Sequence, residues 1–340
     1  MRADPIRAVR FEGGRLLALD QTRLPWEERE LELRTAEQIA SAIARLQIRG
    51  APLIGVAAAY GLALALAADA SERSLAAARA TLANARPTAV NLVHALDLVA
   101  DAALKAPPDE RAAVALATAQ ALEAREEEAS EAIAAHGADL LASARRLLTH
   151  CNTGALAAPG RGTALAVIAE KAARGELELV IATESRPLLQ GSRLTIYELA
   201  RLGIEHRLIV DAAAASLIAA GEVDAVIVGC DRVAANGDVA NKVGTYPLAL
   251  AARAAGIQMV VAGPISTIDP AMPSGAQIVI EERDASEVRL ARGCELTLPD
   301  TRCRNPAFDI TPAELVSALV TERGIACPPR PRSIAQLLRS

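Results

Sequence analysis

The second half of the chain alternates short apolar runs with segments whose apolar residues recur at helical spacing. The apolar runs predict strands at 147–151, 177–183, 206–210, 225–229 and 258–262. The periodic segments predict helices at 163–173, 191–202, 213–220 and 244–255. Because this alternation is typical of parallel strands joined by right-handed helical crossovers, it predicts an α/β fold built on a doubly wound parallel sheet.

The first part of the chain has no such alternation. Two weakly alternating runs flank Gly13-Gly14, which predicts a β-hairpin, and helical periodicity then dominates up to a long alanine-rich segment that begins at Asp109. Because the pattern changes near residue 146, we predict two domains. The first, 1–145, is a small set of strands with a helical bundle, and the second, 146–340, is the α/β domain.

A capping-box pattern, Thr311-Pro312-Ala313-Glu314, lies near the C-terminus ahead of apolar residues at helical spacing. It predicts one more helix, which would end at Gly324. The proline-rich residues 327–332 then predict a tail that lies over another surface.

Composition and charge exclude several classes of function. The 340 residues are 52% apolar but only 2% aromatic, and the net charge of −5 comes from interspersed acids and bases, which argues against nucleic acid as a main partner. No apolar run reaches the roughly 20 residues of a membrane span, although 54–68 comes nearest. Since the N-terminus lacks the apolar segment of a signal peptide, we predict a cytoplasmic protein with no membrane partner.

Cysteine and histidine usage predicts no metal site. The five cysteines are widely spread without a CxxC pair, and the four histidines show no metal-ligand spacing. No GxGxxG motif follows a predicted strand, and there is no Walker A motif. We therefore expect reduced thiols, no metal and no cofactor.

The stretch GCDRVAANGDVANKVGTY, from Gly229 to Tyr246, is polar although it directly follows a buried apolar run. Open parallel sheets bind ligands at the carboxyl ends of their strands. We therefore interpret the stretch as a strand-to-helix loop that lines a ligand site; the alternative is a solvated connection. Polar segments follow other predicted strands as well, so their side chains should converge on one crevice: His150-Cys151-Asn152, Glu184-Ser185-Arg186 and Asp211.

Two residues of this edge are candidates for chemistry. Cys151 lies at a strand end ahead of a polar turn, although a lone cysteine is usually a packing residue. His150, its neighbour, should point to the opposite face of the strand and so should not act as its base. Asp231 follows an apolar strand, where desolvation can keep a carboxyl protonated and able to serve as an acid; the alternative is an ion pair with Arg232 or Arg186.

Two arginines precede predicted helices and suggest an anion site. Arg49 lies on a glycine-bearing turn before a buried helix, where backbone N–H groups and the helix dipole attract anions; the alternative is that it caps the preceding helix. Arg86 repeats the arrangement, although taken alone it would be a surface residue. Together with Lys242 and the carboxyls, these cations suit a small phosphorylated polyol.

Seven ordered motifs resemble those of the methylthioribose-1-phosphate isomerase family, and the likeness covers nearly the whole chain. The motifs are LLALDQTRLPWEE, IRGAPLIGVAAAYG, RPTAVNL, HCNTGALA, ESRPLLQGSRLT, GCDRVAANGDVANKVGTYPLA and NPAFDITP. The resemblance implies a smaller N-terminal domain followed by a Rossmann-like C-terminal domain, and it implies a homodimer. The activity that it implies is that of an intramolecular oxidoreductase of the aldose–ketose isomerase type, which acts in methionine salvage. It places the catalytic pair at Cys151 and Asp231. It places substrate binding at Arg49, Gly50, Ala51, Arg86, Gln190, Asn241 and Lys242.

The chain also departs from the family pattern. Ser185 stands where the family commonly has threonine, Cys230 where alanine is common, and Ala212-Ala213 where asparagine and methionine usually follow the aspartate. The last change could alter the substituent accepted at C5 of the sugar, so an isomerase of 5-deoxyribose 1-phosphate or ribose 1,5-bisphosphate is an alternative. A second alternative is a non-catalytic binding protein, similar to the regulatory subunits of the initiation-factor exchange complex.

Overall fold

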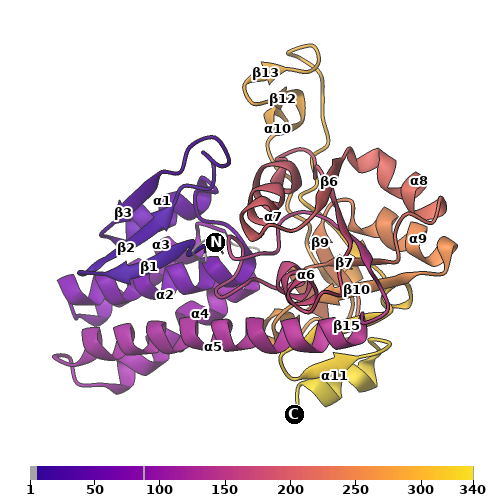
Figure 1. Cartoon of the computed structure of the whole chain (residues 1–340). Helices are drawn as coiled ribbons and strands as arrows, with labels where there is room; N and C mark the ends of the chain where they lie inside the picture. The colour runs from indigo at the N-terminus through magenta and orange to yellow at the C-terminus, as the bar shows by residue number, and fades with distance from the viewer. Residues whose placement is uncertain (1–5, 87–88, 340) are drawn as a thin grey trace. The chain divides into compact units, whose positions relative to one another are not determined.

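The computed structural model describes residues 6–86 and 89–339, which form two compact units (Figure 1). The helical unit holds 6–131 and 154–162, and the sheet unit holds 132–153 and 163–339. The long helix α5 (Arg111–Leu140) begins in the first and ends in the second. The units thus divide elsewhere than at the 145/146 boundary expected from the sequence, because periodicity does not reveal that a segment returns to an earlier unit.

The helical unit combines an antiparallel sheet of order β1-β2-β3 with a bundle of helices. The predicted hairpin is confirmed: Gly13 and Gly14 make its turn with φ of 56° and 71°, values that glycine adopts without strain. The strands of this unit are β1 (Val9–Glu12), β2 (Arg15–Leu19) and β3 (Glu30–Leu33). Its helices, besides the start of α5, are α1 (Ala36–Ala44), α2 (Ala51–Ala68), α3 (Glu72–Ala83) and α4 (Val90–Lys105).

Helix α2 forms the core of this unit and is buried nearly all round, as its uninterrupted apolar sequence predicts. Gly55 lets the helix approach α4, because a Cβ atom there would lie 3.0 Å from the carbonyl oxygen of Asn91. Length and composition alone would let α2 cross a membrane, but 72% of this 18-residue window is buried inside the protein, as in the core helix of a soluble protein.

The sheet unit is built on a sheet of order β16-β15-β10-β7-β4-β5-β6 among the described residues. All neighbouring pairs are parallel except β15 and β16. Each predicted strand and helix of the alternating region is present. The strands are β4 (Arg146–Thr149), β5 (Leu179–Thr183), β6 (His206–Ile209), β7 (Ala225–Val228), β10 (Gln258–Ala262), β15 (Ala318–Thr321) and β16 (Gly324–Ala326). The helices are α6 (Ala164–Ala173), α7 (Ile196–Leu202), α8 (Ala214–Ala219), α9 (Thr245–Ala255) and α11 (Pro331–Leu337).

Helices cover both faces of this sheet, which confirms the predicted doubly wound α/β fold. Successive residues of β7 point to opposite faces: Val226 and Val228 pack with α8, α9 and α11, whereas Ala225 and Ile227 pack with α6, α7 and the end of α5. Because both faces are buried, every residue of β7 is apolar, as its continuous run predicts.

The stretch after β7 is not the plain loop that the sequence suggested. It forms a hairpin of β8 (Arg232–Ala234) and β9 (Val239–Lys242) within a small sheet of order β11-β8-β9-β14. Asn236-Gly237 makes the turn, and this pair is a strong hairpin signal that the interpretation overlooked. The other elements here are β11 (Ile268–Asp269), α10 (Ser286–Arg289), β12 (Leu290–Ala291), β13 (Cys294–Glu295) and β14 (Phe308–Thr311).

The helix predicted to run from Thr311 to Gly324 is wrong. Thr311 ends β14, and a single short turn, Ala313–Leu315, leads into β15 and β16. The reason is tertiary pairing, because β15 adds to the open edge of β10 and all four of its residues are buried there. The tail also contains a helix, α11, which packs against the core of the sheet unit through Ile334 and Leu337.

Short helical turns complete the chain and mark several strand ends. They are the π-helical turn Gly191–Thr195 and the 3₁₀ turns Asp211–Ala213, Ile265–Thr267, Gly275–Gln277 and Ala313–Leu315. The π-helical turn leads directly into α7, and such turns are frequent at functional sites.

Candidate functional site

The sheet changes its direction of winding between β4 and β7. From β4 the chain moves outward to β5 and β6, then returns to the other side with β7, β10 and β15. Ligands of doubly wound sheets bind at the carboxyl ends of the two strands where this reversal occurs. Cys151 follows β4 and Asp231 follows β7, so both candidate catalytic residues lie at the reversal point of the sheet unit.

The backbone of Cys151 has φ of 64°, a left-handed conformation that costs energy in a residue with a side chain. Its N–H donates to Ser185 Oγ at 2.8 Å, and its carbonyl accepts from the hydroxyl of Thr195 at 2.6 Å. Asn152 extends this contact, since its Nδ2 donates to Glu198 Oε1 at 2.7 Å and to Thr195 Oγ1 at 3.3 Å. The peptide groups on both sides of the thiol are therefore fixed.

Both ring nitrogens of His150 bond to partners other than the neighbouring thiol. Its Nε2 lies 2.9 Å from the carbonyl oxygen of Val243, which can only accept, so Nε2 carries the proton. In the neutral ring Nδ1 then accepts from the hydroxyl of Thr183 at 2.6 Å. Gly244 leaves room for the ring, because a Cβ atom there would lie 2.9 Å from it. The imidazole thus links the ends of β4, β5 and β9.

Burial lowers the pKa of His150, although the carboxylate of Asp211, 4.0 Å from Nδ1, opposes this. A folded pKa below the ordinary value of about 6.5 means that neutral His150 stabilises the fold above that pH, and that this contribution is lost as the pH falls below it. We expect the urea-unfolding midpoint of the wild type to fall between pH 7.5 and 5.5 more steeply than that of His150→Asn.

The matched control for this prediction is His94→Asn, because His94 is exposed on the helical unit. It should keep the wild-type slope of midpoint against pH. Equal slopes in the wild type and His150→Asn would contradict the prediction. The wild-type slope alone is not sufficient, because Asp309 changes stability with pH in the opposite direction. Burial raises the pKa of Asp309 to about 6, so its protonation at lower pH favours the folded state.

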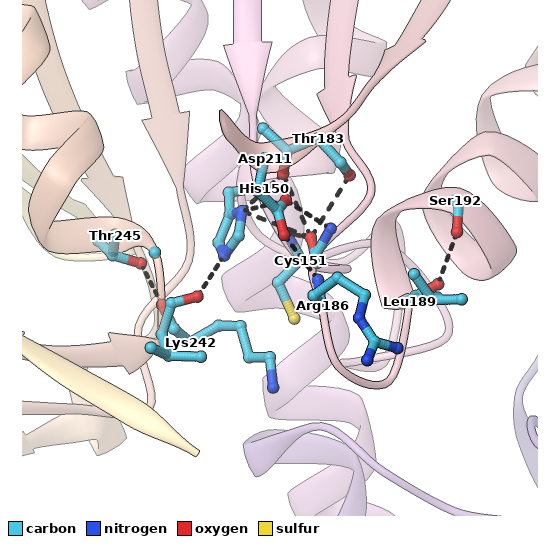
Figure 2. Close-up of polar contacts among 12 residues, drawn as sticks. His150, Cys151, Thr183, Arg186, Leu189, Ser192, Asp211, Lys242 and Thr245 are labelled. Atoms are coloured by element: carbon cyan, nitrogen blue, oxygen red, sulfur yellow. Dashed lines mark hydrogen bonds and ion pairs between the residues drawn. The ribbon is translucent and has the colours of Figure 1, made fainter. Parts of the chain in front are cut away.

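Strand β9 carries Asn241 and Lys242 with both side chains buried. Asn241 Nδ2 donates to Thr245 Oγ1 at 2.9 Å, and the hydroxyl of Thr245 donates to the carbonyl of Lys242 at 2.7 Å. Burial lowers the pKa of Lys242, while Cys151, Asp231 and Glu287 favour its charged form. The ammonium therefore lies near both candidate catalytic residues, and Figure 2 shows it directed into the same space as the thiol of Cys151.

Asp231 is half-buried between β7 and the hairpin, and its N–H donates to the carbonyl of Ala240 at 3.0 Å. The sequence analysis named Arg232 and Arg186 as alternative ion-pair partners of Asp231, and both form hydrogen bonds with other residues. Arg232 Nε donates to Asp269 Oδ2 at 3.0 Å, and Arg186 donates to backbone carbonyls, including that of Val288 at 2.8 Å. These contacts fix the positions of both guanidinium groups.

Cys230, next to Asp231, has a different character from Cys151. Its thiol bonds to Thr267 Oγ1 at 3.3 Å, and burial raises its pKa to about 12. Because the thiolate is the reactive form, Cys230 is an inert packing residue near neutral pH. Gly263 makes room for it, since a Cβ atom there would lie 2.4 Å from the sulfur.

Gln190 lies at the start of the π-helical turn and is 9% exposed. Within the described part of the chain its Oε1 is buried and has no hydrogen-bond partner. A buried amide oxygen without a partner is costly, and a ligand hydroxyl group would satisfy it. Gly191 is required behind it, because a Cβ atom there would lie 1.8 Å from the carbonyl oxygen of Thr183.

The remaining predicted binding residues belong to the helical unit. Gly50 has φ of 97° at the start of α2, and a Cβ atom there would lie 2.2 Å from the carbonyl oxygen of Ala157, so only glycine fits. Arg49 directly precedes this turn, and Ala51 is the first residue of the helix. Arg86 follows α3, but Pro87-Thr88, the rest of its predicted turn, lies outside the described residues.

Sequence reasoning missed residues that hold these segments in place. Asp20 accepts from Gln47 Nε2 at 2.8 Å, and the N–H of Gln21 donates to the carbonyl of Gln47 at 3.1 Å, which fixes the chain just before Arg49. In the sheet unit Asp309 accepts from the N–H of Gly244 at 2.7 Å and so caps the start of α9. In the sequence these residues stood out only as members of the motifs LDQT, which contains Asp20 and Gln21, and NPAFDITP, which contains Asp309.

Comparisons with known proteins agree with this architecture. The model of the Initiation factor 2 subunit family matches residues 47–328. A methylthioribose-1-phosphate isomerase of Alcanivorax borkumensis is 49% identical over 321 residues, which cover 94% of this chain and 93% of that protein. A 5-deoxyribose 1-phosphate isomerase of Moorella thermoacetica is 48% identical over 345 residues, covering 98% of each chain. The crystal structure of 5-methylthioribose 1-phosphate isomerase from Pyrococcus horikoshii matches with a TM-score of 0.92 and 38% identity, covering 99% of this chain and 97% of that one.

Proposed function

The chain belongs to the Initiation factor 2 subunit family, and on this basis we propose that it is an aldose–ketose isomerase of methionine salvage. Its substrate is 5-methylthio-α-D-ribose 1-phosphate and its product is 5-methylthio-D-ribulose 1-phosphate. The observation that carries the proposal is the buried ammonium of Lys242, which lies near Cys151 and Asp231 where the winding of the sheet reverses. The names of the matched isomerases support the same assignment.

Phosphate binding falls to the cations in this proposal. Because burial destabilises the charge of Lys242, an anionic ligand beside it gains a strong partner that water does not screen. Gln190 and Asn241 bind sugar hydroxyl groups, for which the buried Oε1 of Gln190 supplies an acceptor. The likeness of the motifs adds Arg49, Gly50, Ala51 and Arg86 of the helical unit as substrate-binding residues, with the two arginines assigned to the phosphate.

The chemistry follows from the position of the phosphate. An aldose whose anomeric oxygen carries phosphate cannot open spontaneously to a free aldehyde, so the ring oxygen must be protonated while the bond to C1 breaks. Asp231 donates this proton as general acid. One hydrogen then moves from C2 to C1, the hydroxyl at C2 loses its proton, and a ketone forms at C2. Because the hydrogen moves within the substrate, the reaction needs no external oxidant or reductant.

Cys151 serves the hydrogen transfer. In a proton-transfer route its thiolate removes the hydrogen of C2 as a proton, which leaves an enol that is reprotonated at C1. In a hydride route the hydrogen passes directly from C2 to C1, and Cys151 stabilises the transition state. The family resemblance also predicts a homodimer, and the residues themselves predict a cytoplasmic protein; both remain predictions.

The deciding experiment compares turnover of the purified protein on methylthioribose 1-phosphate and 5-deoxyribose 1-phosphate, by following ketose formation. We expect kcat/KM to favour the methylthio sugar at least about tenfold, the scale that a small apolar substituent contributes in a fitted pocket. The assay contains no added metal or nucleotide.

Each other outcome points to a different function. Equal or better use of the deoxy sugar would favour the activity that the Moorella thermoacetica relative is named for. It would also indicate that Ala212-Ala213, which follow the end of β6, alter the part of the pocket that accepts the C5 substituent. Absence of turnover on both sugars would contradict the isomerase proposal and favour a binding protein.

A further inference from the structure

Two residues with side chains adopt left-handed backbone conformations at neighbouring strand ends. Cys151 follows β4 with φ of 64°, and Ser185 follows β5 with φ of 62°. Such conformations each cost of order 1–3 kcal/mol and persist only where the surroundings hold them. The two residues are joined directly, because the N–H of Cys151 donates to Ser185 Oγ at 2.8 Å.

Asp211 holds Ser185 in turn. Its Oδ1 accepts from the N–H of Ser185 at 2.7 Å, and its Oδ2 accepts from the N–H of Arg186 at 2.7 Å. Asp211 begins the short turn after β6, so the hydrogen bonds pass from the end of β6 to the end of β5 and on to the end of β4. Figure 2 shows these dashed contacts converging above the thiol of Cys151.

The direction of the hydrogen bonds around Ser185 is determined by His150. The ring accepts from the hydroxyl of Thr183, so Thr183 Oγ1, 3.3 Å from Ser185 Oγ, can only accept from the hydroxyl of Ser185. The carbonyl oxygen of Thr183, at 3.4 Å, is a second acceptor for the same hydroxyl. Ser185 Oγ therefore faces the N–H of Cys151 with its lone pairs. The N–H of Cys151 thus donates to Ser185, and the hydroxyl of Thr183 donates to His150.

We propose that Ser185 and Asp211 are positioning residues that hold Cys151 in its left-handed conformation and so aim its thiol at the reacting carbons of the sugar. This role rests on the proposed function, since it concerns the geometry of the same reaction. Neither side chain is itself assigned a contact with substrate. Removal of the Ser185 hydroxyl leaves the N–H of Cys151 without its acceptor, and the residue can then relax toward an ordinary conformation.

The test uses Ser185→Ala and Asp211→Asn in the full-length protein. We expect both to lower kcat about tenfold or more, with KM changed less than about threefold, because misplacement of a reacting group acts on the transition state. We also expect iodoacetamide to modify Cys151 at least about threefold faster, the scale set by one lost hydrogen bond. Peptide mass spectrometry gives this rate relative to that of the exposed Cys294.

Two control variants separate positioning from general disturbance. Ser185→Thr keeps the hydroxyl and should restore both kcat and the alkylation rate. Ser192 lies in the nearby π-helical turn, and its hydroxyl donates to the carbonyl of Leu189 at 3.2 Å (Figure 2). Ser192→Ala therefore removes a hydroxyl that does not contact Cys151, and it should resemble the wild type.

The two readouts keep the outcomes distinct. An unchanged alkylation rate at Cys151 in Ser185→Ala and Asp211→Asn would overturn the proposal, whatever the melting temperature. If the wild type turned over neither sugar, the proposed function would fail, but the alkylation rates would still decide whether the network positions the thiol. If Ser185→Ala did not fold, Asp211→Asn alone would decide.

Discussion

Replacement of Asp231 by asparagine is expected to lower kcat by at least about 10²-fold, the usual scale of general acid catalysis. Asparagine has the same shape as aspartic acid but no acidic proton to give to the ring oxygen of the substrate. The backbone contact from the N–H of Asp231 to the carbonyl of Ala240 does not involve the side chain, so the hairpin that carries Lys242 should keep its place.

The pH dependence distinguishes an acid from a merely polar residue. A general acid acts only in its protonated form, so the wild-type kcat/KM should fall on the alkaline side of the profile. That limb should be absent from Asp231→Asn. Asp300→Asn, an exposed change in the sheet unit, is the matched control and should leave turnover unchanged. Near-wild-type turnover of Asp231→Asn would remove this residue from the mechanism.

Hydrophobic periodicity predicted the sheet unit well because its strands are buried on both faces. The run 225–229 became β7, and the helices at 163–173 and 244–255 became α6 and α9 with ends shifted by a residue. The pattern failed at 311–324, where β15 gains its stability from pairing with β10, a partner more than fifty residues away in sequence. Local propensity carries no record of such a partner.

The candidate site was predictable only in part, for a similar reason. A parallel sheet brings the ends of its strands together, so the alternation predicted that Cys151 and Asp231 lie at the same edge. That β4 and β7 are neighbours, with the winding reversal between them, follows only from the strand order in the structure. The hydrogen-bonding role of Ser185, and the way His150 links two strand ends to Val243, depend on backbone angles and on partners far along the chain. No spacing rule in the sequence contains that information.

Replacement of Cys151 by serine is expected to lower kcat by at least about 10²-fold. Serine keeps nearly the same size, but its hydroxyl is far less acidic than a thiol and cannot supply an anion near neutral pH. The hydrogen bonds to Ser185 and Thr195 involve only the backbone of Cys151, so the loop should be retained. Circular dichroism and the melting temperature check that the fold is unchanged.

Cys230→Ala is the matched control, because it removes a thiol from the neighbouring strand end whose pKa of about 12 keeps it neutral. It should retain turnover within about twofold, since the residue only packs against its surroundings. Comparable losses in Cys151→Ser and Cys230→Ala would indicate that disturbed packing, and not a reactive thiol, explains the effect.

Substrate deuterated at C2 then separates the two roles of Cys151. If its thiolate removes a proton, part of the deuterium exchanges with water before C1 is reprotonated, whereas a hydride shift delivers all of it to C1. With the base role, the residual turnover of Cys151→Ser should show a larger primary isotope effect than the wild type, because the step that the thiolate assists becomes rate-limiting. Full retention of deuterium at C1 would leave Cys151 as a group that stabilises the transition state, consistent with its position near the buried ammonium of Lys242.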